Sequence, residues 1–128
     1  MRIITISSDT SLIKLIDTPD VKGQNQLLVY NKSNDLLDAV SFIHTNHPSV
    51  LIVDDDFLKP DTAHLLKNVK KLNPDLAIIF ITSDPGIELG KDVSQVGIHF
   101  YGLKPLGENE LEDSIKSITK LKTTLTQY

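Results

Sequence analysis

The hydrophobic residues of this chain form short unbroken runs, separated by longer segments in which apolar residues recur at helical spacing. Five runs are rich in branched or aromatic side chains with almost no polar alternation, and we expect them to be strands: Ile3–Ile6, Leu27–Tyr30, Val50–Val53, Ala77–Thr82 and Ile98–Tyr101. Runs without alternation are typical of strands that a parallel sheet buries on both faces.

The segments that follow four of these strands carry apolar residues at the three- and four-residue spacing of amphipathic helices. The predicted inward-facing residues are Leu12, Leu15 and Ile16; Leu36, Leu37, Val40 and Ile43; Leu65, Leu66, Val69 and Leu72; and Leu111, Ile115, Ile118, Leu121 and Leu125. Asp9 or Thr10 is the expected N-cap of the first helix. Ser33 or Asn34 is the expected N-cap of the second.

The segment from Pro85 to Val96 is a weaker helix candidate, because Gly86 and Gly90 each cost roughly 1 kcal/mol relative to alanine inside a helix. We expect this helix to be short or mobile and to end at Gly97. Its low intrinsic stability makes it the element that is most easily displaced.

Strands and helices therefore alternate along the chain, and no two strands are joined by a hairpin turn. Right-handed crossovers and a doubly wound parallel α/β sheet are the economical solution. We expect one domain over residues 1–128, in which segment 122–128 is either the end of the last helix or the start of a linker.

Composition narrows the class of protein further. The chain has 128 residues, a formal net charge of -4 and no cysteine, which excludes a disulfide framework and a thiolate metal site. Its 13 Lys and Arg residues are scattered, so they form no footprint for a nucleic-acid backbone. No window is suited to a signal peptide or a membrane span. These features predict a soluble, cytoplasmic protein that does not bind nucleic acid directly.

Polar residues follow four of the predicted strands: Ser7-Ser8-Asp9, Asp54-Asp55-Asp56, Thr82-Ser83-Asp84 and Lys104. In a doubly wound sheet these strands are neighbours, and ligands bind at the edge where their carboxyl ends meet. Carboxylates that meet there repel one another unless a cation lies among them, and either Lys104 or a divalent ion can supply it. A carboxylate, a hydroxyl and an ammonium around one concavity form a site for a phosphoryl group, with an aspartate as nucleophile.

The same residues resemble a known family, the receiver domains of two-component response regulators. The segment Gly97–Leu106, which reads Gly-Ile-His-Phe-Tyr-Gly-Leu-Lys-Pro-Leu, is similar to the family's Gly-Ala-x-x-Tyr-x-x-Lys-Pro-Phe stretch. Ile79–Ser83 matches the strand that ends in Thr/Ser-Ala, and Pro48–Asp54 matches the strand that ends in the phosphoacceptor. The resemblance covers essentially the whole chain, and it implies a flavodoxin-like topology with strand order 2-1-3-4-5.

The resemblance implies a role for each matching residue: Asp54 as phosphoacceptor, Thr82 as switch hydroxyl, Tyr101 as switch aromatic residue, and Lys104 as the conserved lysine. Family members usually have a cis peptide bond after this lysine, here Lys104-Pro105. Asp56 and Asp84 each lie two residues after a matched position, where family members tune the lifetime of the phosphoryl group.

The chain departs from the family at the end of the first strand, where receivers carry two adjacent acidic residues that hold Mg²⁺. Ser7 and Ser8 occupy these positions, and the nearest carboxylate is that of Asp9, the candidate N-cap. A serine hydroxyl is a weak Mg²⁺ ligand beside a carboxylate. We therefore expect at most a weak Mg²⁺ site, formed by Asp9, Asp54 and Asp56.

Two hypotheses for the function follow. In the first, the chain is no enzyme beyond its own phosphotransfer and dephosphorylation, and Asp54 accepts a phosphoryl group from a histidine kinase or phosphotransfer protein. In the second, it is an atypical receiver that binds proteins without phosphorylation, as Ser7 and Ser8 favour. We expect residues 85–121 to form the face that contacts a downstream protein or a second copy of the chain. A small flavodoxin-like binding protein is a third, weaker hypothesis, because no Gly-rich phosphate loop follows any strand.

Overall fold

The computed structural model describes the backbone of residues 1–126 and the side chains of residues 1–123. Five parallel strands form one sheet in the order β2-β1-β3-β4-β5, which confirms the predicted fold class and strand order. The strands are β1 (Arg2–Ile6), β2 (Gln26–Tyr30), β3 (Val50–Asp54), β4 (Ala77–Thr82) and β5 (Phe100–Leu103). The helices are α1 (Thr10–Ile16), α2 (Pro19–Lys22), α3 (Leu36–Asn46), α4 (Asp55–Leu58), α5 (Thr62–Leu72), α6 (Ile87–Ser94) and α7 (Glu110–Thr126).

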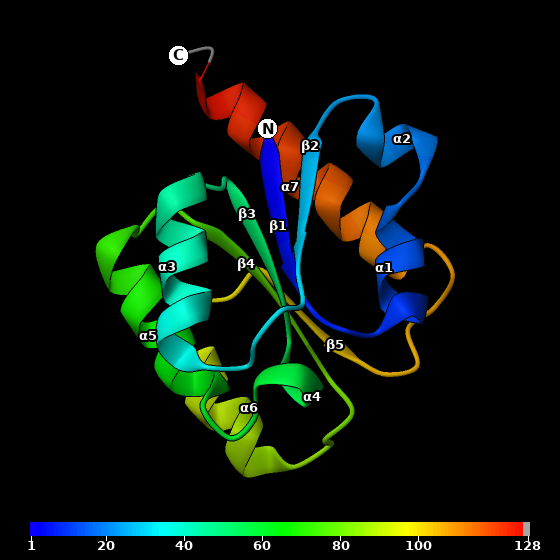
Figure 1. Cartoon of the computed structure of the whole chain (residues 1–128). Coiled ribbons are helices and arrows are strands. Elements are labelled where there is room, and N and C mark those ends of the chain that lie inside the picture. Colours follow the sequence, from blue (N-terminus) through cyan, green and yellow to red (C-terminus); the bar gives the residue numbers. More distant parts are fainter. Residues whose placement is uncertain (127–128) are drawn as a thin grey trace.

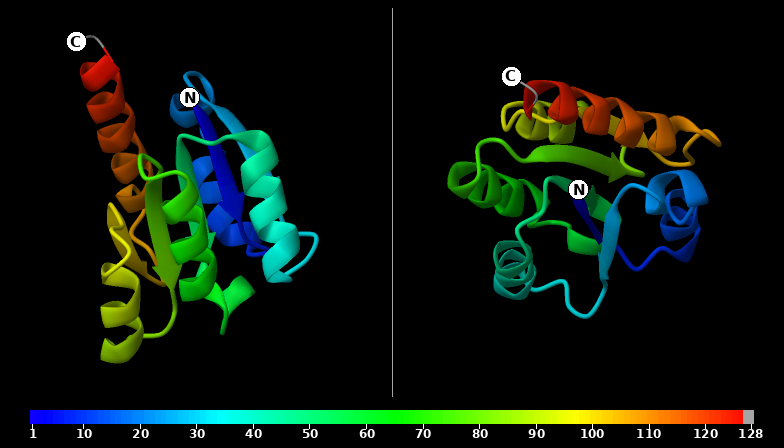
Figure 2. Two further views of the ribbon diagram at one scale, coloured as in Figure 1. Left: turned by 90° about the vertical axis from the view of Figure 1, so that its left-hand side faces the viewer. Right: turned by 90° about the horizontal axis from the view of Figure 1, so that it is seen from above.

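Helices cover both faces of the sheet (Figures 1 and 2), with α1, α2 and α7 on one face and α3, α5 and α6 on the other. In β3 the side chains alternate between two cores, so that Val50 and Ile52 belong to the core under α1 and α7. Leu51 and Val53 belong to the core under α3 and α5. Because both faces are covered, β3 and β4 are buried along their whole length. This double burial is the physical reason why their sequences show no polar alternation.

Three leucines that were expected to face inward are exposed instead, by 74%, 61% and 49% respectively: Leu37, Leu72 and Leu121. Leu37 follows the partly buried Leu36 by one residue, which is a rotation of about 100° around the helix, and Ala39 takes the inward position. Leu72 is the last residue of α5, and the buried Leu76 of the next loop joins the core in its place. Leu121 lies in the C-terminal part of α7, which extends beyond the sheet (Figure 1). The side chain of Leu125 lies outside the described part of the chain.

The sequence pattern did not indicate two short helices, α2 and α4. In α2, Pro19 is the first helical residue, and the Thr18 side chain accepts a hydrogen bond from the Val21 amide at 3.3 Å. The Thr-Pro-Asp sequence that stops α1 therefore also starts a helix, because proline is favourable at the first helical position. In α4, Asp54 Oδ1 accepts from the Asp56 amide at 3.1 Å, so the acidic run begins a helical turn directly after β3.

Two helix starts differ from the expected ones. The N-cap of α3 is Asp35, whose carboxylate accepts from the Asp38 amide at 3.4 Å; the predictions of Ser33 or Asn34 were wrong. The segment 85–96 does contain a short helix of eight residues, but Gly86 is its N-cap and lies outside the interior. The glycine cost inside this helix therefore comes from one glycine, at position 90.

β5 begins at Phe100, two residues later than the pattern predicted. Gly97 has a φ of +88°, so the chain turns there, and Ile98 and His99 complete the bend before the strand begins. The bend is held by the His99 amide, which donates to the Ile78 carbonyl at 2.8 Å. The positive φ confirms that a glycine closes the segment after α6.

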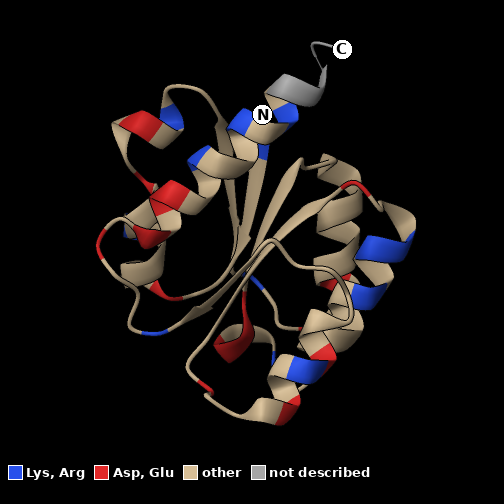
Figure 3. Ribbon diagram, turned by 180° about the vertical axis from the view of Figure 1, so that it is seen from behind, with Lys and Arg blue, Asp and Glu red and all other residues tan. Residues whose placement is uncertain are grey.

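Residues 122–126 of the expected tail continue α7, and residues 127 and 128 lie outside the described part of the chain. Acidic residues lie in the first turn of α7, where they suit the helix dipole, and lysines lie further along the helix but outside its last turn (Figure 3). Among the described residues, every helix is too short or too polar to span a membrane.

Candidate carboxylate site at the edge of the sheet

Four predicted site residues come together at the carboxyl edge of the sheet, each from a different segment: Asp54 from the end of β3, Asp9 from the loop before α1, Asp56 from α4, and Lys104 from the loop after β5. The Lys104 Nζ lies 3.0 Å from an oxygen of Asp9, 3.0 Å from Asp54 Oδ1 and 3.1 Å from Asp56 Oδ2. One ammonium therefore contacts three carboxylates, which we call the Lys104 cluster.

Burial and hydrogen bonding shift the pKa values of three members of the Lys104 cluster: Asp9, Asp56 and Lys104. The hydrogen bond from Lys104 lowers the pKa of Asp9 despite partial burial of that carboxyl. Burial opposes the ionisation of Asp56, but hydrogen bonds from Ser83 and Lys104 hold its pKa below the ordinary value. Burial also favours the neutral amine of Lys104, yet hydrogen bonds to the three carboxylates raise its pKa. Lys104, Asp9 and Asp56 are therefore charged at neutral pH.

Ser7 occupies the first of the two positions at which receivers carry acidic residues. Its hydroxyl donates to Asp54 Oδ2 at 2.6 Å and accepts from the Asp9 amide at 3.0 Å. Both Ser7 and Asp54 are buried, whereas Ser8 is exposed. Ser7 therefore satisfies the oxygen of Asp54 that faces away from Lys104, and it adds no charge to the site.

Asp9 has two roles at once, because its two oxygens have different partners. Oδ1 accepts from the Ser11 amide at 3.0 Å and from the Leu12 amide at 3.3 Å, which confirms the predicted N-cap of α1. Oδ2 pairs with Lys104 at 3.0 Å. The N-cap hydrogen bonds fix the carboxylate in place, so Lys104 meets an oriented oxygen.

The hydroxyl of Thr82 donates to Asp55 Oδ2 at 2.8 Å, and this carboxylate was absent from the predicted site. Thr82 is fully buried and Asp55 is 3% exposed. The sequence contained a signal for Asp55, since it directly follows a strand that is buried on both faces. Adjacent residues of the Asp54-Asp55-Asp56 run therefore have different partners.

Tyr101 is half-buried and packs against the core under α3, α5 and α6, with its ring centroid 5.1 Å from that of Phe80. Burial raises the pKa of the Tyr101 hydroxyl, and the negative charges of Asp55 and Asp84 add to this effect. The ring therefore lies within the electrostatic reach of Asp55, the partner of Thr82.

The remaining predicted features lie at the edge of the Lys104 cluster. The Lys104-Pro105 peptide bond is cis, as predicted, and the Lys59-Pro60 bond is also cis. Asp84 accepts from the Gly86 amide at 2.8 Å and so bonds within its own loop. Of the two positions that were expected to tune phosphoryl lifetime, only Asp56 therefore contacts Lys104.

The Lys104 cluster contains the three carboxylates that were predicted to bind Mg²⁺. Their oxygens converge on the Lys104 ammonium, and no group of three acidic, His or Cys side chains in the described part of the chain is arranged to hold a metal ion. The position next to Asp54 that a carboxylate could fill is taken by the Ser7 hydroxyl. This donor arrangement does not fit a metal ion, and Mg²⁺ binding stays a prediction.

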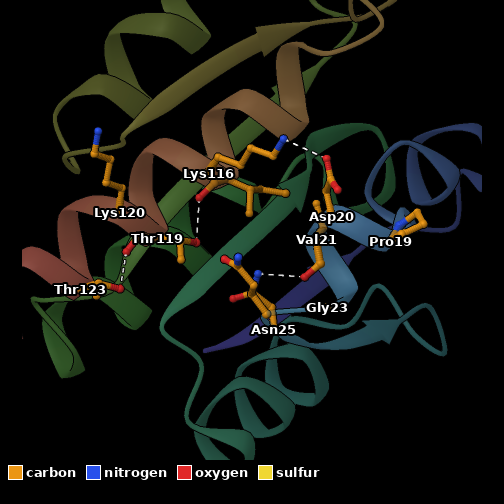
Figure 4. A pocket seen from close by; sticks show the side chains of 11 residues that line it. Pro19, Asp20, Val21, Gly23, Asn25, Lys116, Thr119, Lys120 and Thr123 are labelled. Carbon is orange, nitrogen blue, oxygen red and sulfur yellow. Dashed lines mark hydrogen bonds and ion pairs between the residues drawn. The ribbon is translucent and has the colours of Figure 1, made fainter.

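A separate hollow of about 640 Å³ lies between α2, the start of β2 and α7 (Figure 4). On its rim the Lys116 Nζ is 3.2 Å from Asp20 Oδ2. Asn25, which directly precedes β2, places this hollow at the amino edge of the sheet, opposite the Lys104 cluster. It contains none of the predicted site residues.

The fold and the site define a class of protein, the doubly wound domain with receiver topology. Among solved structures, the chain is similar to a response regulator receiver domain from Clostridium thermocellum, with 20% identity, coverage of 97% of this chain and 98% of that chain, and a TM-score of 0.76. It is similar to the signal receiver domain of a putative Luxo repressor protein from Vibrio parahaemolyticus, with 20% identity, 98% and 95% coverage, and a TM-score of 0.78.

A third similar structure is a putative pilus assembly protein from Burkholderia thailandensis, with 16% identity, 94% and 98% coverage, and a TM-score of 0.73. No protein-family model and no curated protein matches the sequence. The resemblance to receiver domains is therefore confirmed as a resemblance of fold.

Proposed function

We propose that this chain is a receiver module of two-component signalling in the cytoplasm, and that Asp54 accepts a phosphoryl group from a histidine kinase or a phosphotransfer protein. One observation carries the proposal: Asp54 ends the central strand with the Lys104 ammonium 3.0 Å from its Oδ1. A carboxylate with a fixed cation beside it can take on the additional charge of a phosphoryl group.

In the proposed reaction, a carboxylate oxygen of Asp54 attacks the phosphorus of a phosphohistidine. A P–O bond forms while the P–N bond breaks, and the imidazole leaves with the electron pair. Asp54 is 2% exposed and both of its oxygens have partners, so the attacking oxygen must first exchange one of them. Lys104 remains as the cation that stabilises the charge on the phosphoryl oxygens.

The proposed partner face is formed by α6, β5 and α7, within residues 85–121. A groove of about 670 Å³ runs between α6 and β5 and is lined by Gly90 and Tyr101 among others. Ile87 and Leu103 are 76% and 45% exposed at this face. Exposed apolar side chains beside a groove suit a downstream protein or a second copy of the chain.

The test is incubation of the full chain with acetyl phosphate, with and without MgCl₂, followed by intact mass spectrometry. We expect the parent to gain the mass of one phosphoryl group and Asp54→Asn to gain none. Asp55→Asn is the matched control, since it removes a neighbouring carboxylate that is not the proposed nucleophile. A mass gain that persists in Asp54→Asn would refute the proposal. So would a parent chain that gains no phosphoryl mass with either acetyl phosphate or a phosphorylated histidine kinase.

The Ser7 hydrogen bond favours a second candidate, a receiver-like module that binds its partner without phosphorylation. The 2.6 Å bond from Ser7 satisfies Asp54 Oδ2, and the Lys104 ammonium lies 3.0 Å from Oδ1, so both oxygens of Asp54 already have partners. In that case Asp54→Asn would leave partner binding unchanged. Isothermal titration calorimetry of the partner protein into the parent and the variant measures this. Partner binding that requires phosphorylation of the parent, and that Asp54→Asn therefore lacks, would favour the first candidate.

A further inference from the structure

We propose that Asp55 is a positioning residue that holds the Thr82 hydroxyl away from Asp54 and so fixes the resting arrangement of the loop after β4. The inference about switching rests on the proposed function, whereas the resting arrangement does not. The key observation is the 2.8 Å hydrogen bond from Thr82 Oγ1 to Asp55 Oδ2, between two buried side chains.

The chemistry of the hydroxyl makes this contact exclusive. A threonine hydroxyl can donate one hydrogen bond, and in this structure Asp55 accepts it. The same oxygen accepts from the Asp84 amide at 3.0 Å, so its accepting side is also engaged. Thr82 can therefore donate to a phosphoryl group on Asp54 only after it has released Asp55.

Releasing Asp55 is costly because the carboxylate is nearly inaccessible to water. Asp55 is 3% exposed, and its side chain oxygen has a charge-assisted hydrogen bond with the hydroxyl. Removing one partner leaves a buried acceptor without compensation, which disfavours the released state. On this basis we expect the hydrogen bond to shift the equilibrium toward the resting state by roughly 10-fold to 100-fold.

A neighbouring bond adds to the attachment of this loop. Ser83 Oγ donates to Asp56 Oδ1 at 2.7 Å, so two successive carboxylates of α4 bind two successive hydroxyls at the end of β4. The two bonds differ in burial, because the pair at Ser83 is exposed and the pair at Thr82 is buried. Only the buried pair involves the hydroxyl that was predicted to switch.

The test measures amide hydrogen exchange of the unphosphorylated full chain by NMR. The variants are Asp55→Ala, Thr82→Val and the double substitution, and the reporter is the Asp84 amide, which donates to Thr82 Oγ1. We expect exchange to be roughly 10-fold faster in Asp55→Ala, and at least as fast in Thr82→Val, which also removes the acceptor of this amide. The double variant should be no faster than Thr82→Val alone, because Thr82→Val already removes both contacts of the hydroxyl.

Conservative variants separate a positioning role from simple loss of structure. Thr82→Ser keeps the hydroxyl and should exchange as slowly as the parent. Asp55→Asn keeps an acceptor without the charge, so its exchange should lie between those of the parent and Asp55→Ala. Ser83→Ala is the matched control, because it removes the exposed bond and leaves the buried one. Unchanged Asp84 exchange in Asp55→Ala, or equal acceleration in Ser83→Ala, would overturn the proposal.

A second arm links Asp55 to the switch. We expect phosphorylation to release Thr82 from Asp55 and to change the amide chemical shifts of α6 and β5. At equal phosphorylation by acetyl phosphate, the phosphorylation-induced state seen in these chemical shifts should be several-fold more populated in Asp55→Ala than in the parent. An equal or smaller population in Asp55→Ala would overturn the inference about switching. If no variant is phosphorylated, the proposed function fails, while the exchange data still decide whether Asp55 holds Thr82.

Discussion

Replacing Lys104 by methionine removes the one ammonium of the Lys104 cluster and keeps most of the apolar stem. In the parent, this nitrogen lies within 3.1 Å of three carboxylates. The variant leaves Asp54 buried without its counter-charge, beside Asp9 and Asp56. We expect Lys104→Met to fold and to be less stable at neutral pH.

The contributions of the three ion pairs differ because their burial differs. The side chain of Asp54 is 2% exposed, and loss of one partner of such a buried pair costs about 3–5 kcal/mol. The side chains of Asp9 and Asp56 are 35% and 26% exposed, so solvent screening limits each of those pairs to about 1 kcal/mol or less. The retained stem offsets part of the loss, which leaves about 3 kcal/mol at pH 7.

The pH dependence distinguishes a lost charge from lost packing. In the parent, the lowered pKa values of Asp9 and Asp56 provide stability above the ordinary value of 3.8 that is lost as pH falls through the lowered values. The raised pKa of Lys104 provides stability that is complete below 10.5 and is lost only as pH rises through the raised value. Both contributions are therefore complete between pH 5 and 7, and Lys104→Met removes them together.

In the variant, the crowded carboxylates have no counter-charge, so acidification relieves their repulsion and the deficit should be smaller at pH 5 than at pH 7. The assay is urea unfolding at pH 7 and pH 5 with no phosphodonor present, and we expect a midpoint about 2 M lower than that of the parent at pH 7. Lys91→Met, at an exposed lysine of α6, is the control. An equally large loss at both pH values would refute the electrostatic reasoning, and the packing of the lysine stem would then account for it.

Five further predictions each concern a single feature of the molecule. Gly90→Ala should stabilise α6 by about 0.5–1 kcal/mol, because outside α6 the added carbon meets only the Tyr101 hydroxyl, at 4.0 Å. Gly97→Ala should destabilise the chain by about 1 kcal/mol, because Gly97 has a φ of +88°. Urea midpoints measure both effects. Ser7→Ala should cost about 1–3 kcal/mol by the same assay, because it leaves a buried oxygen of Asp54 without its donor; an unchanged midpoint would contradict this. Mg²⁺, titrated while amide shifts are followed, should bind weakly; saturable binding at physiological magnesium that Asp9→Ala abolishes would show that a metal displaces the lysine. Amides of α6 should exchange faster than those of β4, and equal protection would rule out a mobile partner face.

The sheet could be predicted from the sequence because its signal is local and strong. Val50–Val53 and Ala77–Thr82 are unbroken apolar runs, and the structure buries both completely. The weak points were helix faces and ends, where neighbouring leucines compete for one inward position. Leu37 shows this, since the pattern alone gives it the same weight as Leu36, and only packing decides between them.

The site was partly predictable for a different reason. The carboxyl edge of a parallel sheet brings strand ends together whatever their sequences, so Asp54 and Lys104 could be placed near each other from topology alone. The partner of Thr82 could not be predicted in this way. Asp54 and Asp55 are adjacent, and the topology does not say which of the two carboxylates points toward β4. That choice depends on the helical turn of α4, which the sequence pattern did not indicate.

Ser7, which directly follows β1, limits the negative charge in the Lys104 cluster, where one ammonium contacts three carboxylates. An acidic residue at position 7 would add a fourth carboxylate to the Lys104 cluster, directly against the buried Asp54 and without a further cation. With Ser7 there, Asp54 receives a neutral hydrogen bond on one oxygen and the ammonium on the other, which leaves Lys104 able to serve Asp9 and Asp56 as well. The departure from the receiver pattern therefore belongs to a charge balance that includes Lys104, and Ser7→Asp alone should destabilise the chain unless an added cation restores that balance.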